Sequence, residues 1–191
     1  MFISSNNLIV TSYIIRVHYN YMTIGNQKGF IPLIPVIIIG LVALAGGTVA
    51  ASQNAIPGDA LYGLKNTTEK VRTVLSFTHS EKAKTHLSIT LEKLEDIQKL
   101  QAQGGSGKQI SEAAKSLKDN QDAAIQEFNQ SGDTGQDAID LTKRLQTNSE
   151  QQQNVLSDVL NKVPEAAKES IQHAAESSAK GLQKAQEVNG R

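Results

Sequence analysis

Apolar residues form one unbroken stretch early in the chain and recur every three to four positions later. Residues 29–51 contain no charged side chain. As a helix with a rise of about 1.5 Å per residue, about 23 residues cross the hydrocarbon core of a bilayer. The sequence therefore predicts one transmembrane helix over residues 29–51. Its expected anchoring residues are Phe30, Ile31, Leu33, Ile34, Val36, Ile37, Ile38, Ile39, Leu41, Val42 and Leu44.

Three interpretations of this apolar segment compete. The first is a retained anchor with its N-terminus in the cytoplasm, because Arg16 and Lys28 precede the segment and no acidic residue does. The second is a cleaved signal peptide, with 43–45 (Ala-Leu-Ala) as a cleavage-like triplet. The third is a prepilin-like leader, since 28–31 (Lys-Gly-Phe-Ile) resembles the opening of type IV prepilins, although Ile34 stands where that family carries a glutamate. We adopt the retained anchor as the leading interpretation.

Residues 1–28 form a short head, which the anchor interpretation places in the cytoplasm. Met22 opens a short basic leader directly before the apolar segment. Residues 1–21 are therefore interpreted either as a wrongly assigned translation start or as a disordered tail.

Beyond the apolar segment, residues 52–58 read as a linker and residues 59–189 as a helical-bundle domain. Five stretches carry apolar residues with helical spacing, and no useful length alternates with period two. The sequence therefore predicts an all-α fold, in which the transmembrane helix precedes an extracytoplasmic antiparallel bundle of about five helices. The five stripes are Leu61, Leu64, Thr68, Val71 and Leu75; Ala83, Leu87, Leu91 and Leu94; Ile110, Ala114, Leu117, Ala124 and Phe128; Leu141, Leu145, Gln152, Val155 or Leu156, and Val159; Ile171, Ala174, Ser178, Leu182 and Ala185.

Capping residues predict where these helices begin. Asp59 follows the Pro-Gly break and is expected to cap the first body helix. Thr78 and Glu81 have the spacing of a capping box for the second. Thr134 resembles a further cap, and Pro164 marks the start of the last helix, where a missing N–H costs little.

Composition and charge exclude some classes of function. The chain has 19 basic and 19 acidic residues, and without Arg16 and Lys28 the body keeps 17 basic and 19 acidic ones. A nearly neutral body argues against nucleic-acid binding, which depends on clustered Lys and Arg. The absence of cysteine excludes disulfides, thiolate metal ligands and a thiol nucleophile.

Two motif-like patterns carry little chemistry. His79 and His86 stand two helical turns apart, about 10 Å, which is too far for both to bind one ion. Residues 104–109 imitate the end of a phosphate-binding loop, but Ala102 occupies the first glycine position and Gln109 replaces the required Ser or Thr. We expect no metal site and interpret 104–107 as a flexible break between helices.

The carboxylates Glu92, Glu95 and Asp96 are candidates for acid–base chemistry. Lys93 and Lys99 are interspersed with them at the spacing of surface ion pairs. We therefore expect a solvated helix face rather than a catalytic cluster.

The stripe from Leu87 to Leu94 allows two interpretations. It packs in the core of the bundle, or it forms a groove for a partner helix. Core packing is the preferred interpretation, because the domain has few other large side chains to bury.

One segment resembles a known family. Residues 56–65 (Ile-Pro-Gly-Asp-Ala-Leu-Tyr-Gly-Leu-Lys) resemble the Pro-Gly-Asp-x-Leu-Tyr-x-Leu-Lys opening of an uncharacterised bacterial helical domain that commonly follows a single membrane helix. Stretches at 69–72, 82–87, 151–167 and 171–185 extend the resemblance over roughly residues 54–188. The family-like motif residues are Pro57, Gly58, Asp59, Leu61, Tyr62, Leu64 and Lys65. The resemblance implies a membrane-tethered extracytoplasmic domain and supplies no catalytic, cofactor-binding or metal-binding residue.

The sequence thus favours a non-catalytic, single-pass protein of the cell membrane. Its expected partners are the lipid bilayer and another envelope protein, with no nucleic acid and no cofactor. The helical domain outside the membrane would serve protein–protein interaction or envelope organisation. The alternatives are a bundle that senses or carries a small ligand or cation, and a secreted helical protein whose leader is cleaved.

Overall fold

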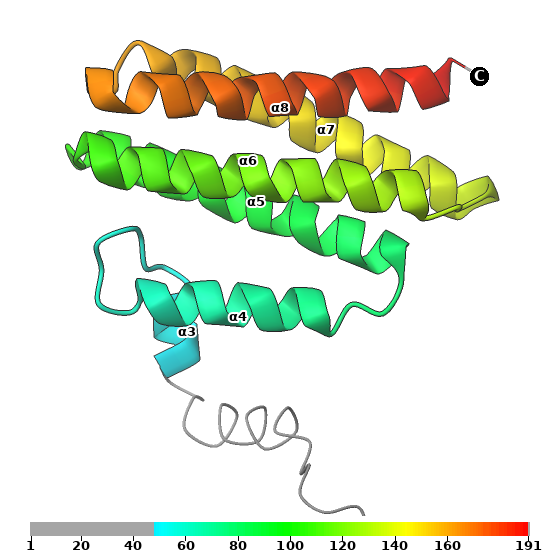
Figure 1. Cartoon of the computed structure of the whole chain (residues 1–191), viewed down its shortest axis with the longest axis horizontal. Helices are drawn as coiled ribbons and strands as arrows, with labels where there is room; N and C mark the ends of the chain where they lie inside the picture. Colours follow the sequence, from blue (N-terminus) through cyan, green and yellow to red (C-terminus); the bar gives the residue numbers. More distant parts are fainter. Residues whose placement is uncertain (1–47, 191) are drawn as a thin grey trace, which may run out of the picture. The chain divides into compact units, whose positions relative to one another are not determined.

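Six helices make up the part of the chain that the structure describes. The computed structural model describes residues 48–190 and contains no strand in this range. The helices are α3 (Thr48–Ser52), α4 (Tyr62–Val74), α5 (His79–Ala102), α6 (Gly107–Gln130), α7 (Gly135–Leu160) and α8 (Glu165–Asn189) (Figure 1). The predicted all-α fold is confirmed for these residues.

Most of the predicted membrane anchor, residues 29–47, lies outside the described residues, as does the head at 1–28. All its expected residues, from Phe30 to Leu44, precede the first described helix. Of the helices between residues 48 and 190, none has both the length and the apolar character to cross a bilayer. The anchor and its orientation therefore stay predictions.

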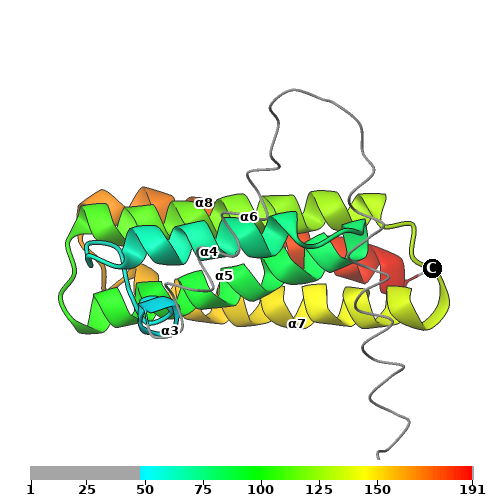
Figure 2. The same cartoon turned by 90° about the horizontal axis from the view of Figure 1, so that it is seen from below.

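The four long helices form a bundle, and α4 makes a further layer on it. Helix α5 packs against α6 and α7, and α8 packs against α6 and α7, so that the consecutive helices α6 and α7 are diagonal rather than adjacent. Figure 1 shows α7 and α8 in one layer, α5 and α6 in the next and α4 outermost, and Figure 2 shows α4 lying over α5 and α6. The short loop at 131–134 therefore joins two helices that are not neighbours, although short loops favour antiparallel neighbours. Gly132 and Gly135, with φ of 62° and 60°, give that loop the backbone freedom to cross the bundle.

Side-chain caps define the starts of α5 and α6. The capping box of Thr78 and Glu81 is confirmed, and Ser106 with Gln109 forms a second capping box in the segment predicted only as a flexible break. Two predicted caps are wrong. Helix α4 begins at Tyr62, beyond Asp59, and the side chain of Thr134 makes no capping hydrogen bond although α7 begins directly after it.

Most positions of the predicted stripes of α6, α7 and α8 are buried in the bundle. Two apolar clusters fill the bundle, one containing Ile97, Leu117 and Ile171 and the other containing Leu87 and Leu145. The predicted positions that are buried are Ala83, Leu87, Leu94, Ile110, Ala114, Leu117, Ala124, Leu141, Leu145, Gln152, Leu156, Val159, Ile171, Ala174, Ser178 and Ala185. Leu91 is instead exposed, and Phe128, Val155 and Leu182 are half-buried. Leu91 falls outside the core because α5 packs against α4 as well as α6 and α7. The side of α5 that these three helices cover does not include Leu91.

A layer of uncharged polar side chains lies inside the bundle. Thr90 of α5, Gln121 of α6, Gln152 of α7 and Ser178 of α8 are all fully buried. The amide nitrogen of Gln152 donates to Thr90 Oγ1 at 3.1 Å and to Gln121 Oε1 at 2.9 Å, and its amide oxygen accepts from Ser178 Oγ at 2.6 Å. Because a buried amide without partners is costly, this layer favours one register of the four helices.

Gly181 allows the helices to approach closely at this layer. A Cβ atom at this position of α8 would lie 2.5 Å from Ser149 Oγ and closer still to Gln121 Nε2. Gly63, in the exposed surface of α4, has no atom within 4 Å of an added Cβ. The two helical glycines therefore provide a matched pair.

We expect Gly181→Ala and Gly63→Ala to change stability in opposite directions. Overpacking lowers the free energy of unfolding of Gly181→Ala by about 1–3 kcal/mol. Gly63→Ala raises it by about 0.5–1 kcal/mol, because alanine loses less backbone entropy in a helix. Urea denaturation of the purified full chain, followed by far-UV circular dichroism, measures both. Equal stabilisation of the two variants would contradict the close approach at Gly181.

Candidate functional site

The family-like motif forms a turn that attaches α4 to the bundle. The carboxylate of Asp59 accepts a hydrogen bond from the backbone N–H of Ile56 at 2.9 Å. Gly58 has φ of 104°, a backbone conformation that favours glycine. The carbonyl oxygen of Pro57 accepts from Gln109 Nε2 of α6 at 2.7 Å. The Pro-Gly-Asp residues thus hold the chain against the start of α6, and Asp59 stabilises this turn instead of capping α4.

Helix α4 turns its polar face toward the bundle. Tyr62, Lys65 and Glu69 are its buried residues, and Arg72 is half-buried one turn further on. The predicted apolar stripe lies on the other side, where Leu61 and Leu75 are exposed. Of the motif residues, Pro57, Tyr62 and Lys65 are buried, whereas Leu61 is exposed and Leu64 is half-buried.

Lys65 forms an ion pair with Asp96 in the interior of the described domain. Its Nζ lies 2.7 Å and 2.8 Å from the two carboxylate oxygens of Asp96 on α5. The Lys65 side chain is 2 % exposed and the Asp96 side chain 1 % exposed. Lys65 also donates to the carbonyl oxygen of Ala55 at 3.2 Å. One side chain therefore joins α4, α5 and the segment before the motif.

Lys93 of α5 makes a second buried cationic centre. Its Nζ lies 2.7 Å from Glu69 Oε1 and 3.9 Å from Asp96 Oδ2, and it donates to Asn66 Oδ1 at 3.1 Å. The ammonium group also lies 4.9 Å from the centre of the Tyr62 ring, within the range of a cation–π interaction. Two cations and two carboxylates thus balance between α4 and α5, and we call Lys65, Glu69, Lys93 and Asp96 the buried ion cluster.

Burial dominates the titration of this cluster. It raises the pKa of Glu69 and the pKa of Asp96, while their lysine partners lower both values. Burial and the nearby carboxylates raise the pKa of Tyr62 as well, so its phenol stays neutral. Because each carboxylate contacts a lysine of the other helix, the cluster holds α4 and α5 together.

The prediction that the charged residues of α5 form a solvated face is wrong for Lys93 and Asp96. Both side chains are buried because α4 covers them, and no pattern within α5 itself indicates this. Glu95 and Lys99 do form the expected surface pair, at 2.9 Å. Glu92 pairs with Arg72 of α4 at 2.6 Å and so extends the polar contact along the helix. The missed signal is complementary charge: Lys65, Glu69 and Arg72 share one face of a helix.

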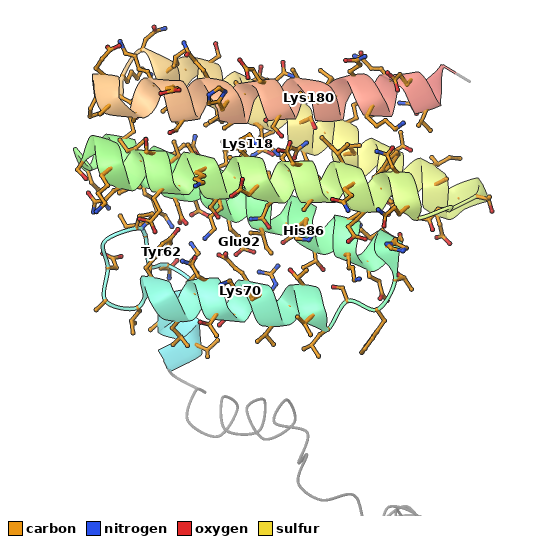
Figure 3. The ribbon with its side chains drawn as sticks, viewed as in Figure 1. Tyr62, Lys70, His86, Glu92, Lys118 and Lys180 are labelled. Carbon is orange, nitrogen blue, oxygen red and sulfur yellow. The ribbon has the colours of Figure 1, made fainter. Side chains whose placement is uncertain are left out.

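Two clefts flank the bundle surface. One, of about 570 Å³, runs between α4, α5 and α6, and Tyr62, Glu69 and His86 contribute to its lining. Figure 3 shows Tyr62, His86 and Glu92 between these helices. The other, of about 440 Å³, lies between α5 and α7 and includes Leu87 and Leu91. We call the second one the α5–α7 groove.

The histidines are separate from one another. His79 Nδ1 lies 2.6 Å from Glu127 Oε2, and His86 Nδ1 lies 2.9 Å from Asn120 Oδ1, both partners being on α6. His173 is exposed on α8. In residues 48–190, no group of three or more acidic, histidine or cysteine side chains is placed to hold a metal ion.

Removal of one charge from the buried ion cluster should strongly destabilise the docking of α4. In Lys65→Met, Asp96 loses its closest cation, and the free energy of unfolding falls by about 3–5 kcal/mol. Lys162→Met is the control, because Lys162 and Asp158 form an exposed pair at 2.6 Å whose loss costs less than about 1 kcal/mol. The double variant Lys65→Met/Asp96→Leu recovers most of the loss, since no unpaired charge stays buried.

Urea denaturation measures these differences, and amide hydrogen exchange locates them in α4 and α5. Equal losses in the Lys65 and Lys162 variants would contradict a stabilising role of the buried pair.

Comparison with known proteins identifies a family and no activity. No curated protein and no solved structure matches the chain. Residues 54–166 match a family described as a domain of unknown function (DUF5667). This match includes the motif turn, α4 and the buried ion cluster, and it covers more than half of the 191 residues. The chain therefore belongs to the DUF5667 family.

Proposed function

We propose that this chain is a non-catalytic, single-pass membrane protein whose helical domain binds another envelope protein outside the membrane. The uncharged segment at 29–51 supports the tether. The pairing of the buried carboxylates with lysines supports binding over catalysis, because a general acid or base needs a free group facing a substrate.

The observation that carries the proposal is the α5–α7 groove. Leu87 and Leu91 belong to its lining, and Leu91 is 36 % exposed although it stands in the predicted apolar stripe of α5. The groove thus offers apolar surface between two long helices, the arrangement in which grooves bind amphipathic helices.

Charge at the groove defines the chemistry of the partner. Three cationic side chains line it, Lys84, Lys143 and Arg144, and the one acidic residue in its lining is Asp140. Asp140 lies 2.9 Å from Arg144 and 3.8 Å from Lys84. The partner segment is therefore amphipathic, with an apolar anchor for Leu91 and acidic residues beside it.

A small-ligand sensor or carrier is the second candidate, and the cleft of about 570 Å³ beside α4 favours it. Its lining combines Glu69, Glu112 and His86 with the phenol of Tyr62. A panel of metal ions and metabolites that raises the melting temperature of the full chain would support this alternative. A uniform lack of response excludes it.

The retained anchor and the cleaved leader make different mature N-termini. Fractionation of cells followed by N-terminal sequencing separates them. A secreted chain that begins after Ala45 would exclude the tether, whereas a membrane-bound chain that still contains residues 29–51 supports it.

Photo-crosslinking tests the groove directly. A photoreactive phenylalanine in place of Leu91 should give one discrete adduct in intact cells, whereas the same residue in place of the exposed Gln172 of α8 should not. The charge-reversing double variant Lys143→Glu/Arg144→Glu should lower the adduct yield about fivefold to tenfold, because rim charges steer association.

The control reverses two exposed lysines away from the groove, Lys162→Glu/Lys168→Glu, and should leave the yield unchanged. Absence of an adduct at position 91, or equal sensitivity to both double variants, would overturn the groove as the binding site.

A further inference from the structure

Helix α4 buries polar residues and exposes apolar ones, which is the reverse of a helix that packs on a protein core. Its buried residues are Tyr62, Lys65 and Glu69, and Arg72 lies on the same side, paired with Glu92. Away from this polar side, Leu75 is 46 % exposed, and Val74, at the edge of the cleft between α4, α5 and α6, is 65 % exposed. Ordinary packing would bury the apolar side, since each buried leucine or valine contributes about 1.5–3 kcal/mol.

The apolar side continues into the turn after α4. Phe77 is 84 % exposed, the highest value among the large hydrophobic residues that the structure describes as exposed. Together with Leu61, Leu64, Val71, Val74 and Leu75 it forms what we call the outer face of α4. A contiguous exposed apolar face of this kind marks a surface that contacts something else.

The charges around the outer face suit a surface rich in phosphate groups. The one acidic residue in α4, Glu69, points inward, whereas the exposed Lys70 of α4 lies at the cleft between α4, α5 and α6, next to Val74 (Figure 3). Acidic residues at the two ends are engaged locally. Asp59 accepts from the N–H of Ile56, and Glu81 accepts from the N–H groups of Phe77 and Thr78.

The described chain begins beside α4. Helix α3, which contains the last residues of the apolar segment, contacts α4. It projects below α4 in Figure 1 and lies beside α4 in Figure 2. Residues 53–61 connect it to α4, and nine residues span at most about 32 Å.

This connection is packed against the domain and does not hang free. Ser52 is fully buried, Ala55 accepts from Lys65, and Ile56 joins the larger apolar cluster. The predicted linker at 52–58 therefore holds the end of the apolar segment close to α4.

We propose that the outer face of α4, with Phe77, lies on the surface of the bilayer in which the apolar segment is anchored. This inference rests on the proposed membrane tether. The apolar side chains enter the boundary between headgroups and acyl chains, as in interfacial amphipathic helices, and Lys70 lies among the lipid phosphates. The buried ion cluster on the opposite side of α4 then holds the bundle on this interfacial helix, so that the α5–α7 groove is presented at a fixed orientation to the membrane.

A tryptophan introduced into the outer face tests the contact. The chain contains no tryptophan, so one substitution supplies the whole signal. We choose Phe77→Trp and Val74→Trp as two independent probes, and Ile139→Trp on α7, where Ile139 is 60 % exposed, as the matched control. The full-length chain is reconstituted into phosphatidylcholine/phosphatidylglycerol vesicles with or without lipids that carry bromine on the upper acyl chain.

The expected result is a blue-shifted emission for the two outer-face probes and about twofold quenching by the brominated lipid, as for side chains at the acyl boundary. Ile139→Trp should emit as in water and keep its intensity. Far-UV circular dichroism of each variant confirms that the bundle is folded, and two probes keep the test valid if one variant does not fold.

The possible failures are distinguishable. If the chain does not float with vesicles, the membrane tether of the proposed function is wrong. If the chain floats but neither outer-face probe is quenched, this inference alone is overturned. A blue shift without quenching that disappears when the chain is diluted in lipid would assign the face to a second copy. A shift seen only in native envelopes would assign it to another protein, and each of these two results overturns the bilayer contact.

Discussion

The placement of α4 depends on charges that have been removed from water. Lys65 and Lys93 approach Asp96 and Glu69 to 2.7 Å between two helices, in a region where all four side chains are buried. Burial of an isolated charge costs several kcal/mol, and only close pairing with hydrogen bonds offsets this cost. The cluster is therefore a strict constraint, because α4 has one orientation in which each charge meets its partner. The outward direction of its apolar residues follows from that orientation.

The bundle beneath α4 uses a different polar device. The amide of Gln152 contacts residues of α5, α6 and α8 between two apolar clusters, and Gly181 provides the space that this layer requires. Uncharged groups suit this position, since their burial is less costly than that of ions as long as every group is hydrogen-bonded. One layer sets the register of the four long helices, and the buried ion cluster sets where the fifth is attached.

In the proposed function, these two constraints join the start of the described domain to the binding surface. The chain after the apolar run is packed through Ser52 and Ile56, and the motif turn is held by Gln109 of α6. The residues of the family-like motif thus keep α4 against the helices that form the α5–α7 groove.

The sequence by itself determined the helical class, the ends of most helices to within a few residues, and most apolar positions of α6, α7 and α8, because these depend on local spacing and capping. The capping box of Thr78 and Glu81 is of this kind. Only the tertiary structure decided that Asp96 and Lys93 are interior, that Leu91 is exposed, and that the stripe of α4 faces outward. Each of these depends on which helix covers which face. Apolar periodicity reports that a helix has two sides, but when buried ion pairs compete with apolar packing, the partner helix decides which side turns inward.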